Sequence, residues 1–282
     1  MQFKYLCLFV VIFTISCSDK SSGIVSDTLG SENNVSHPLS HKKGACFTTN
    51  VQTWSSRVSA LKVYWHYSWG VNANITEPDS VRFVPMVWSK WSLDRNLAIV
   101  DSLAKVGKVK QLLGFNEPDG KEQANLTVEE SISYWPKLMN LNIPLGSPAC
   151  IHADNAWMKE FMTKAEGKGF RIDFICVHWY GGANAQSLID HLKAIHDLYK
   201  RPIWVTEFAP ADWNASSAAA SKVTKAMALT FMQQILPALE KTDYVERYSW
   251  YSSSPDNAAL GNSALFDTDG KLTQLGEYYS KF

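Results

Sequence analysis

The feature that most constrains the fold of this chain is an alternation of short apolar runs with longer amphipathic stretches. Eight apolar runs follow Lys43, and most are continuous rather than alternating with polar residues. Continuous apolar runs are typical of strands buried on both faces, as in a parallel sheet. The expected strands are Gly44–Thr48, Lys62–Trp69, Arg82–Trp88, Gln111–Glu117, Ile143–Cys150, Asp173–Tyr180, Ile203–Phe208 and Arg247–Tyr251.

Helical signals lie between most of these runs. A capping box of Thr127 and Glu130 marks the start of one helix. A short helix fits Gln52–Ala60, whereas Gly70–Ser80 contains Pro and two Asn and is expected to be a loop. Apolar spacing predicts further helices over Asp94–Gly107, Asp154–Lys168, Gln186–Lys200 and Ser216–Glu240.

Eight strand-then-helix units in about 240 residues have the size of a (β/α)8 barrel. The main competitor is an open doubly wound sheet. Such a sheet usually carries a Gly-rich phosphate-binding turn after its first strand, and this sequence has none there. The expected fold class is therefore α/β, a single (β/α)8 TIM barrel that spans residues 44–282.

The first 43 residues have the pattern of an export signal and a tether. Residues 1–16 hold an apolar run too short to cross a hydrocarbon core of about 30 Å, which indicates a signal peptide. The string Phe13-Thr14-Ile15-Ser16-Cys17 looks like a bacterial lipobox, which predicts a lipoprotein signal peptide with Cys17 as the lipidated residue. The alternative is an ordinary signal peptide with an incidental cysteine.

Residues 17–43 are polar and lack apolar periodicity, so we expect a flexible tether. The protein would then be exported and lipid-anchored to a bacterial membrane, at the outer membrane, the periplasmic side or the cell surface. Its only membrane contact would be the N-terminal lipid. We expect a monomer.

Charge and cysteine content exclude several classes of function. Lys plus Arg and Asp plus Glu both number 27, so the basic excess of a nucleic-acid-binding protein is absent. Neither a C-x-x-C nor an H-E-x-x-H spacing occurs, so we expect no metal site and no cofactor. Cys46, Cys150 and Cys176 follow the predicted lipidation site, and three cysteines allow one disulfide and one thiol, or no disulfide.

Two glutamates follow apolar residues at the ends of the fourth and seventh expected strands. These are Glu117, in Asn116-Glu117-Pro118, and Glu207, in Thr206-Glu207-Phe208. Barrel active sites lie at the carboxyl ends of the strands. A structural ion pair could explain one such carboxylate, but explains less well two in equivalent places. Glycoside cleavage needs two carboxyl groups: one protonates the leaving oxygen, and the other attacks the sugar or activates water.

Aromatic residues are abundant, with 11 Trp, 11 Tyr and 13 Phe, and many of the Trp lie at strand ends. Such rings either enlarge the core or line a cleft on which sugar faces stack. Each of five candidates for a ring platform is also explained by core packing: Trp65, Tyr67, Trp69, Trp88 and Trp179.

Four strings, in order, resemble glycoside hydrolase family 128 of the large clan of retaining (β/α)8 glycosidases. The match runs from about Lys43 to the C-terminus. The resemblance implies endo-acting hydrolysis of β-1,3-glucan with net retention, without a metal or organic cofactor. The four strings are Trp65-His66-Tyr67-Ser68-Trp69, Leu113-Gly114-Phe115-Asn116-Glu117-Pro118-Asp119, Val177-His178-Trp179-Tyr180 and Trp204-Val205-Thr206-Glu207-Phe208.

One residue departs from the family pattern. Related sequences often have Asn where this chain has Ser68, between Tyr67 and Trp69. The change leaves the catalytic pair untouched, but it bears on the pattern of sugar subsites and hence on chain-length preference.

The resemblance also implies a role for each site residue. Glu117 would be the acid/base and Glu207 the nucleophile, while Asn116 would donate a hydrogen bond to the sugar 2-hydroxyl or to the nucleophile. His178 and Tyr180 share a strand face and would orient Glu207 or the substrate, although a core histidine is an alternative for His178. A further expectation is that Trp250 forms the floor under the cleaved sugar.

The expected partner is a β-glucan polysaccharide or oligosaccharide. Two alternatives stay open from the sequence. One is a glycosidase of the same clan that acts on another polysaccharide. The other is a surface glycan-binding lipoprotein that kept the barrel without catalysis.

Overall fold

The structure, a computed structural model, describes residues 40–48, 54–73, 76, 78 and 80–282. The predicted signal peptide, the lipidation site Cys17 and most of the predicted tether lie outside the described residues. No helix among the described residues combines the length and the apolar character needed to cross a membrane.

The centre of the fold is a parallel sheet whose pairing passes through all eight expected strand segments. Its order is β3-β2-β1-β6-β5-β4, and every pairing is parallel. The bounds of these strands are β1 Lys43–Cys46, β2 Trp65–Tyr67, β3 Arg82–Phe83, β4 Ile175–Trp179, β5 Ile203–Phe208 and β6 Val245–Tyr251.

The fourth and fifth expected strands connect β3 to β4 through isolated parallel bridges. Met86 pairs with Leu113 on one side, and Gly146 pairs with Phe174 on the other. Two more bridges, Leu112 to Leu145 and Asn116 to Ala149, join the two segments to each other. The predicted (β/α)8 arrangement is therefore confirmed, although these two segments pair too sparsely to count as regular strands.

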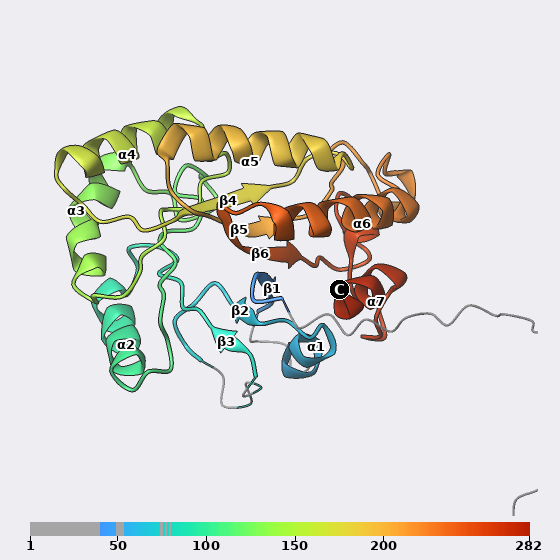
Figure 1. The fold of residues 1–282 in the computed structure, drawn as a ribbon, viewed down its shortest axis with the longest axis horizontal. Helices are drawn as coiled ribbons and strands as arrows, with labels where there is room; N and C mark the ends of the chain where they lie inside the picture. Colours follow the sequence, from blue (N-terminus) through green and yellow to red (C-terminus); the bar gives the residue numbers. More distant parts are fainter. Residues whose placement is uncertain (1–39, 49–53, 74–75, 77, 79) are drawn as a thin grey trace, which may run out of the picture. The chain divides into compact units, whose positions relative to one another are not determined.

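Helices follow the strands in the chain and lie around the outside of them (Figure 1). The predicted capping box is present at the start of α3, where the Thr127 hydroxyl accepts from the Glu130 amide at 3.1 Å. Side-chain caps also begin α4, α5 and α6. The bounds are α1 Trp54–Ala60, α2 Leu93–Lys105, α3 Val128–Met139, α4 Ala156–Gly167, α5 Ala185–Tyr199, α6 Lys225–Lys241 and α7 Gln274–Lys281.

The single helix predicted over Ser216–Glu240 is wrong in its first third. The α-helix α6 begins only at Lys225, and one 3-10 turn, Ala218–Ala220, precedes it. Distant contacts hold this segment as a loop, because the Asn262 amide donates to the carbonyls of Ala218 and Val223, each at 2.8 Å. Residues 209–224 thus form a long loop between β5 and α6.

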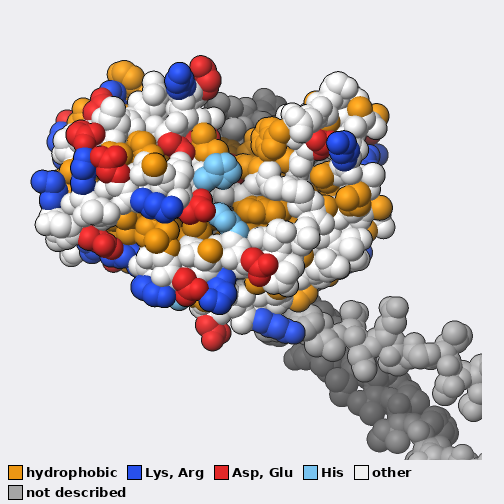
Figure 2. Space-filling model, turned by 90° about the horizontal axis from the view of Figure 1, so that it is seen from above, with side chains coloured by type: hydrophobic (Ala, Val, Ile, Leu, Met, Phe, Trp, Pro, Cys, Tyr) orange, Lys and Arg blue, Asp and Glu red, His pale blue; other side chains and the backbone are white. Residues whose placement is uncertain are grey.

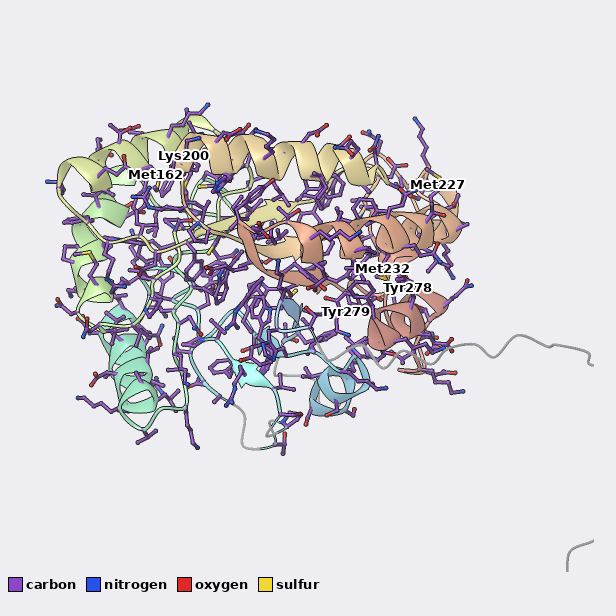
Figure 3. The ribbon with its side chains drawn as sticks, in the orientation of Figure 1. Met162, Lys200, Met227, Met232, Tyr278 and Tyr279 are labelled. Atoms are coloured by element: carbon purple, nitrogen blue, oxygen red, sulfur yellow. The ribbon has the colours of Figure 1, made fainter. Side chains whose placement is uncertain are left out.

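The predicted tether boundary is also corrected, because residues before 44 belong to the barrel. Lys43 lies in β1, is fully buried and donates from Nζ to the Tyr279 carbonyl at 2.8 Å. Lys42 donates to three carbonyls at the C-terminal end of α6. In return the Tyr279 hydroxyl donates to the Gly44 carbonyl at 2.7 Å, and Figure 3 shows Tyr279 on the side of α7 that faces the strands.

Two apolar layers form the core, one between the strands and the helices and one inside the ring of strands. Trp65 belongs to the inner layer, with no exposed surface and its ring 5.3 Å from that of Trp204. A side chain at Gly44 would meet the Trp65 ring at 2.3 Å, which explains the glycine there. The expectation that Trp65 offers a sugar platform is therefore wrong.

The three cysteines of the described residues carry free thiols. Cys46, Cys150 and Cys176 are all buried, and none pairs with another. Burial raises the pKa of each thiol above its ordinary value, so the thiols stay protonated. Of the two alternatives left by the sequence, the one without a disulfide holds for these residues.

Candidate active site

A β-bulge turns Glu207 into the barrel. Val205 and Phe208 both face the outer core, so the strand carries two residues, Thr206 and Glu207, where regular alternation allows one. The pairing of β4 with β5 shifts at the same level and brings His178 opposite Glu207. Bulges commonly re-aim a side chain next to an active site, and this one directs a carboxylate to the barrel mouth.

Glu117 reaches the same place through an unusual backbone conformation. Its φ is 38°, in the left-handed region, and its amide donates to the Ala149 carbonyl at 2.6 Å. This conformation costs a non-glycine residue roughly 1–2 kcal/mol. Trp69 also has a positive φ, 55°, at the end of β2. The two strained positions both bring a side chain to the site.

Glu117 and Glu207 lie close together at the mouth. Carboxylate oxygens of the two residues and a ring nitrogen of His178 all lie within 4.8 Å of one another. Retaining glycosidases hold their carboxyl groups roughly 5–5.5 Å apart, whereas inverting enzymes need about 6.5–9.5 Å to admit a water. The short gap between the two glutamates fits direct attack on the sugar.

Three neighbours donate hydrogen bonds to the Glu207 carboxylate. The Tyr67 hydroxyl and the Trp69 indole reach Oε1 at 2.9 and 2.7 Å, and the Tyr180 hydroxyl reaches Oε2. Burial, and next the charge of Glu207, raise the pKa of Tyr67 and of Tyr180, so both stay protonated donors. Tyr67 is fully buried, so it holds Glu207 and does not form the predicted ring platform.

His178 contacts both glutamates. Its Nδ1 lies 2.9 Å from Glu117 Oε1, and its Nε2 lies 3.4 Å from Glu207 Oε1. Burial alone lowers the pKa of this imidazole, but the charges of Glu207 and Glu117 outweigh burial and raise the pKa above its ordinary value. His178 is thus a buried link between the two carboxylates.

These three residues do not form a good metal site, although their oxygen and nitrogen atoms are close. A cation bound by Glu207 would have to displace the hydrogen bonds from Tyr67 and Trp69 to its Oε1 atom. The Tyr180 hydroxyl points at the other oxygen. These N–H and O–H donors stabilise a negatively charged carboxylate that binds no metal, because they occupy the oxygen atoms that a metal ion would need.

Asn116 lies beside Glu117 with only 4% of its surface exposed. Its Nδ2 donates to Gln123 Oε1 at 3.2 Å, while its Oδ1 is buried without a hydrogen-bond partner among the described residues. An unpartnered buried oxygen is costly unless a ligand satisfies it. The sequence did not single out Gln123, since nothing local marks it as a partner of Asn116.

Two cavities meet at the glutamates, and we call them the large arm and the small arm. The large arm has a volume of about 710 Å³, and the small arm has about 280 Å³. Both are lined by Glu117, Gln123, Glu207 and Tyr251. The pair of carboxylates therefore lies at the junction of a cleft that extends to either side.

The remaining aromatic candidates divide between the arms. Trp69 and Trp88 line the small arm. Trp179 lines the large arm, although its ring also stacks on Phe231 of α6 at 5.4 Å. Other residues of the large arm were not predicted, because no local motif marks them. Two of them, Ser187 and His191, lie on α5, and the others lie on loops: Ile151, His152, Trp213 and Leu260.

The expectation for Trp250 is wrong. Its side chain is fully buried in the apolar layer between the strands and the helices. There its indole donates to the Ser263 carbonyl at 2.9 Å, and its ring lies 5.1 Å from that of Phe208. Successive residues of a strand face opposite sides. Tyr251, the next residue of β6, is therefore the one that faces the cleft and lines both arms.

The surface carries charges of both signs. On the face shown in Figure 2, Lys and Arg side chains are interspersed with Asp and Glu side chains. That face shows no large patch of one sign, in keeping with the equal numbers of basic and acidic residues in the sequence.

Comparison with known proteins places the chain in a family. Residues 44–279 match the family described as "Glycosyl hydrolase catalytic core". Among curated proteins, alkali-sensitive linkage protein 1 of Schizosaccharomyces pombe is 31% identical over 229 residues. That alignment covers 77% of this chain, and the chain spans only 40% of the yeast protein.

Solved structures agree with this match. A variant of a GH128 subgroup I endo-beta-1,3-glucanase from Amycolatopsis mediterranei, bound to laminarihexaose, is 30% identical, with a TM-score of 0.75 over 86% of this chain and 99% of that one. A subgroup II endo-beta-1,3-glucanase from Sorangium cellulosum is 28% identical, with a TM-score of 0.69 over 85% and 97%.

A third structure has a different mode of action. The subgroup III curdlan-specific exo-beta-1,3-glucanase from Blastomyces gilchristii is 26% identical, with a TM-score of 0.67 over 86% of this chain and 98% of that one. The match over residues 44–279 and the likeness over nearly the whole length of these enzymes lead to one conclusion: the chain belongs to the glycosyl hydrolase catalytic-core family, and its structural relatives are enzymes of glycoside hydrolase family 128.

Proposed function

We propose that this protein is a retaining endo-β-1,3-glucanase. The observation that carries the proposal is the pair of glutamates at the barrel mouth, with carboxylate oxygens within 4.8 Å of each other. The three solved structures named above are of β-1,3-glucanases, which supports the same linkage here.

The first chemical step assigns a separate role to each glutamate. Glu207 attacks the anomeric carbon, the bond from that carbon to the leaving oxygen breaks, and Glu117 gives its proton to that oxygen. A covalent glycosyl ester on Glu207 results. The donors Tyr67, Trp69 and Tyr180 hold the Glu207 carboxylate in place before the attack.

The second step reverses these roles. Water attacks the anomeric carbon, Glu117 takes its proton, and the ester bond to Glu207 breaks. Two inversions at one carbon give net retention. Asn116 lines the small arm beside Glu117, so its amide group would hold the reacting sugar during both steps.

The shape of the cleft supports endo action over exo action. The large and small arms share the glutamate pair and, apart from the four residues that line both, have different lining residues, so a glucan chain can occupy both arms and continue past the cleaved bond in both directions. An exo-acting enzyme needs only one such arm, with a closed end at the other side.

The test is release of reducing sugar from laminarin, compared with mannan, xylan and cellulose. We expect release from laminarin alone, with oligosaccharides of several lengths among the early products. Glucose as the only early product would favour exo action. Activity on another glycan would indicate a clan relative of different specificity, and no product from any glycan would leave a non-catalytic glycan-binding protein.

We also propose that the protein is exported and lipid-anchored through Cys17. The support is the sequence alone: a short apolar run, the Phe13–Cys17 string and a polar stretch after it. Two or more acyl chains on one cysteine suffice for stable anchoring. The catalytic domain would then act as a monomer on β-glucan near the membrane surface.

A further inference from the structure

Trp213 is an exposed tryptophan at the edge of the large arm. Its side chain, on the long loop 209–224, is 64% exposed, and it lines the cavity. The indole is nevertheless fixed, because Nε1 donates to the Tyr180 carbonyl at 3.1 Å and the ring packs edge-on against the Tyr180 ring at 5.8 Å. A ring that is already fixed loses little freedom when a ligand stacks on it, which favours binding.

The loop that carries Trp213 is itself tied down. The carboxylate of Asp212 accepts from the amides of Asn214 and Lys222 at 3.2 and 2.7 Å. The amide of Asp212 donates to the Ala259 carbonyl at 3.1 Å. These bonds fix the backbone on both sides of the indole, so its position does not depend on a bound ligand.

The rest of the large arm combines apolar and polar groups in a way that suits a sugar. Ile151 is 41% exposed, and Leu260 lies deeper. His152 and His191 also line this arm and carry ring nitrogens. Burial lowers the pKa of His191 in spite of the opposing charge of Asp154, so the imidazole stays neutral with one donor and one acceptor nitrogen, which matches a hydroxyl group.

The two arms differ in which part of the substrate they can take. Asn116 is the neighbour of Glu117 and lines only the small arm, so the reacting sugar belongs there. Glu117 lines both arms and must reach the leaving oxygen. The leaving part of the chain therefore extends into the large arm, toward Trp213.

We propose that Trp213 is the platform on which the leaving-group sugars of the glucan stack, and that this contact makes long chains better substrates than short ones. The inference rests on the proposed function and adds to it a residue that determines specificity. The apolar face of a β-linked glucose ring would lie on the indole, and its hydroxyl groups would face His152 and His191.

The test compares two substrates that differ only in the leaving part. Laminarihexaose fills the large arm, whereas laminaritriosyl fluoride has a single fluorine atom as leaving group and leaves the arm empty. In Trp213→Ala we expect kcat/KM for laminarihexaose to fall by about tenfold, while kcat/KM for the fluoride stays within about twofold of the wild type. Trp213→Phe, which keeps a ring, should lose less.

Trp91→Ala is the matched control. Trp91 is 68% exposed on another loop after a strand, and it lines neither arm. Trp91→Ala should leave kcat/KM unchanged for both laminarihexaose and the fluoride. Equal losses of Trp213→Ala on both substrates, at an unchanged melting temperature, would overturn the proposal, as would an unchanged rate on laminarihexaose.

A second readout tests the platform without relying on hydrolysis rates. A sugar bound in the large arm can replace water in the second step: its hydroxyl oxygen bonds to the anomeric carbon, the ester to Glu207 breaks, and Glu117 takes the proton. Trp213→Ala should therefore lower the ratio of transglycosylation to hydrolysis when laminaribiose is added. If the wild type releases nothing from laminarin, the proposed function fails, whereas an unchanged ratio in an active enzyme rejects only the platform.

Discussion

His178 Nδ1 lies 2.9 Å from Oε1 of Glu117, while the other nitrogen of the same ring lies 3.4 Å from Oε1 of Glu207. The imidazole is 2% exposed, so water screens these contacts very little. One buried ring therefore connects the proposed acid/base to the proposed nucleophile. A change in its protonation affects both carboxylates at once.

His178 should make stability depend on pH. Its pKa is raised in the folded protein, so the stabilisation is full below the unfolded value of about 6.5 and is lost as pH rises through the folded value. In His178→Gln this loss should disappear, and kcat/KM should fall by about 100-fold because the glutamates are less well positioned. Urea unfolding of both proteins at several pH values above and below about 6.5 measures the pH dependence of the free energy of unfolding. A slope equal to that of the wild type would refute the prediction.

The two glutamates should be told apart by azide. Glu207→Ala and Glu117→Ala should each lose activity by about 10³-fold or more on an activated β-laminaribioside. Azide should restore turnover in both, with an α-glycosyl azide from Glu207→Ala and a β-glycosyl azide from Glu117→Ala. NMR of the products distinguishes them. The same anomer from both variants, or near-native activity of Glu207→Ala, would contradict the roles assigned to the two glutamates.

Neighbouring aromatic residues of β6 should behave in opposite ways. Trp250→Ala removes a buried ring and should destabilise the fold by about 3–5 kcal/mol. Tyr251→Ala should cost much less stability but should reduce kcat/KM, because Tyr251 lines both arms. Chemical denaturation and laminarin kinetics on both variants check this. Loss of activity without loss of stability in Trp250→Ala would contradict the assignment of Trp250 to the core and of Tyr251 to the cleft.

Because of Lys43, the free energy of unfolding should be larger in mild alkali than at neutral pH. Burial lowers its pKa to about 8, below the unfolded value of about 10.4. Between about pH 8 and 10 the unfolded chain binds a proton that the folded chain has lost, so the free energy of unfolding rises with pH. Lys43→Met, which fills the same space without a charge, should show a flatter dependence. Parallel curves for the two proteins would exclude this effect.

Cys17 should carry the lipid if the chain is exported by a bacterial host. Cys17→Ala should lose incorporation of labelled palmitate and move from the membrane fraction to the soluble fraction. Cys7→Ala is the matched control, since Cys7 lies within the predicted signal peptide and should change neither result. Labelled palmitate in Cys17→Ala would place the lipid elsewhere.

Much of the fold could be predicted because local patterns determine it. The expected strand Ile203–Phe208 matches β5 residue for residue, since a strand buried on both faces is apolar along most of its length. The capping box of Thr127 and Glu130 marks the start of α3 because the cap is made within four residues. Glu117 and Glu207 were predictable as a pair from their positions at strand ends.

Other features could not be predicted, because they depend on contacts between distant residues. Which of Trp250 and Tyr251 faces the cleft depends on the phase of the strand, and a shift of one residue reverses it. The bulge at Thr206 brings Glu207 inward, and no local pattern marks it. Trp213 gains its role only through the Tyr180 carbonyl, 33 residues earlier in the chain.

The sequence by itself determined the barrel, the order of its strands and the two carboxylates, since apolar periodicity and residue chemistry are local properties. Only the tertiary structure decided that Glu117 and Glu207 lie within reach of one sugar and that His178 links them. It also decided that the cleft continues on both sides of the pair. Distances between side chains on different strands arise from the closure of the sheet, which no segment of the chain encodes alone.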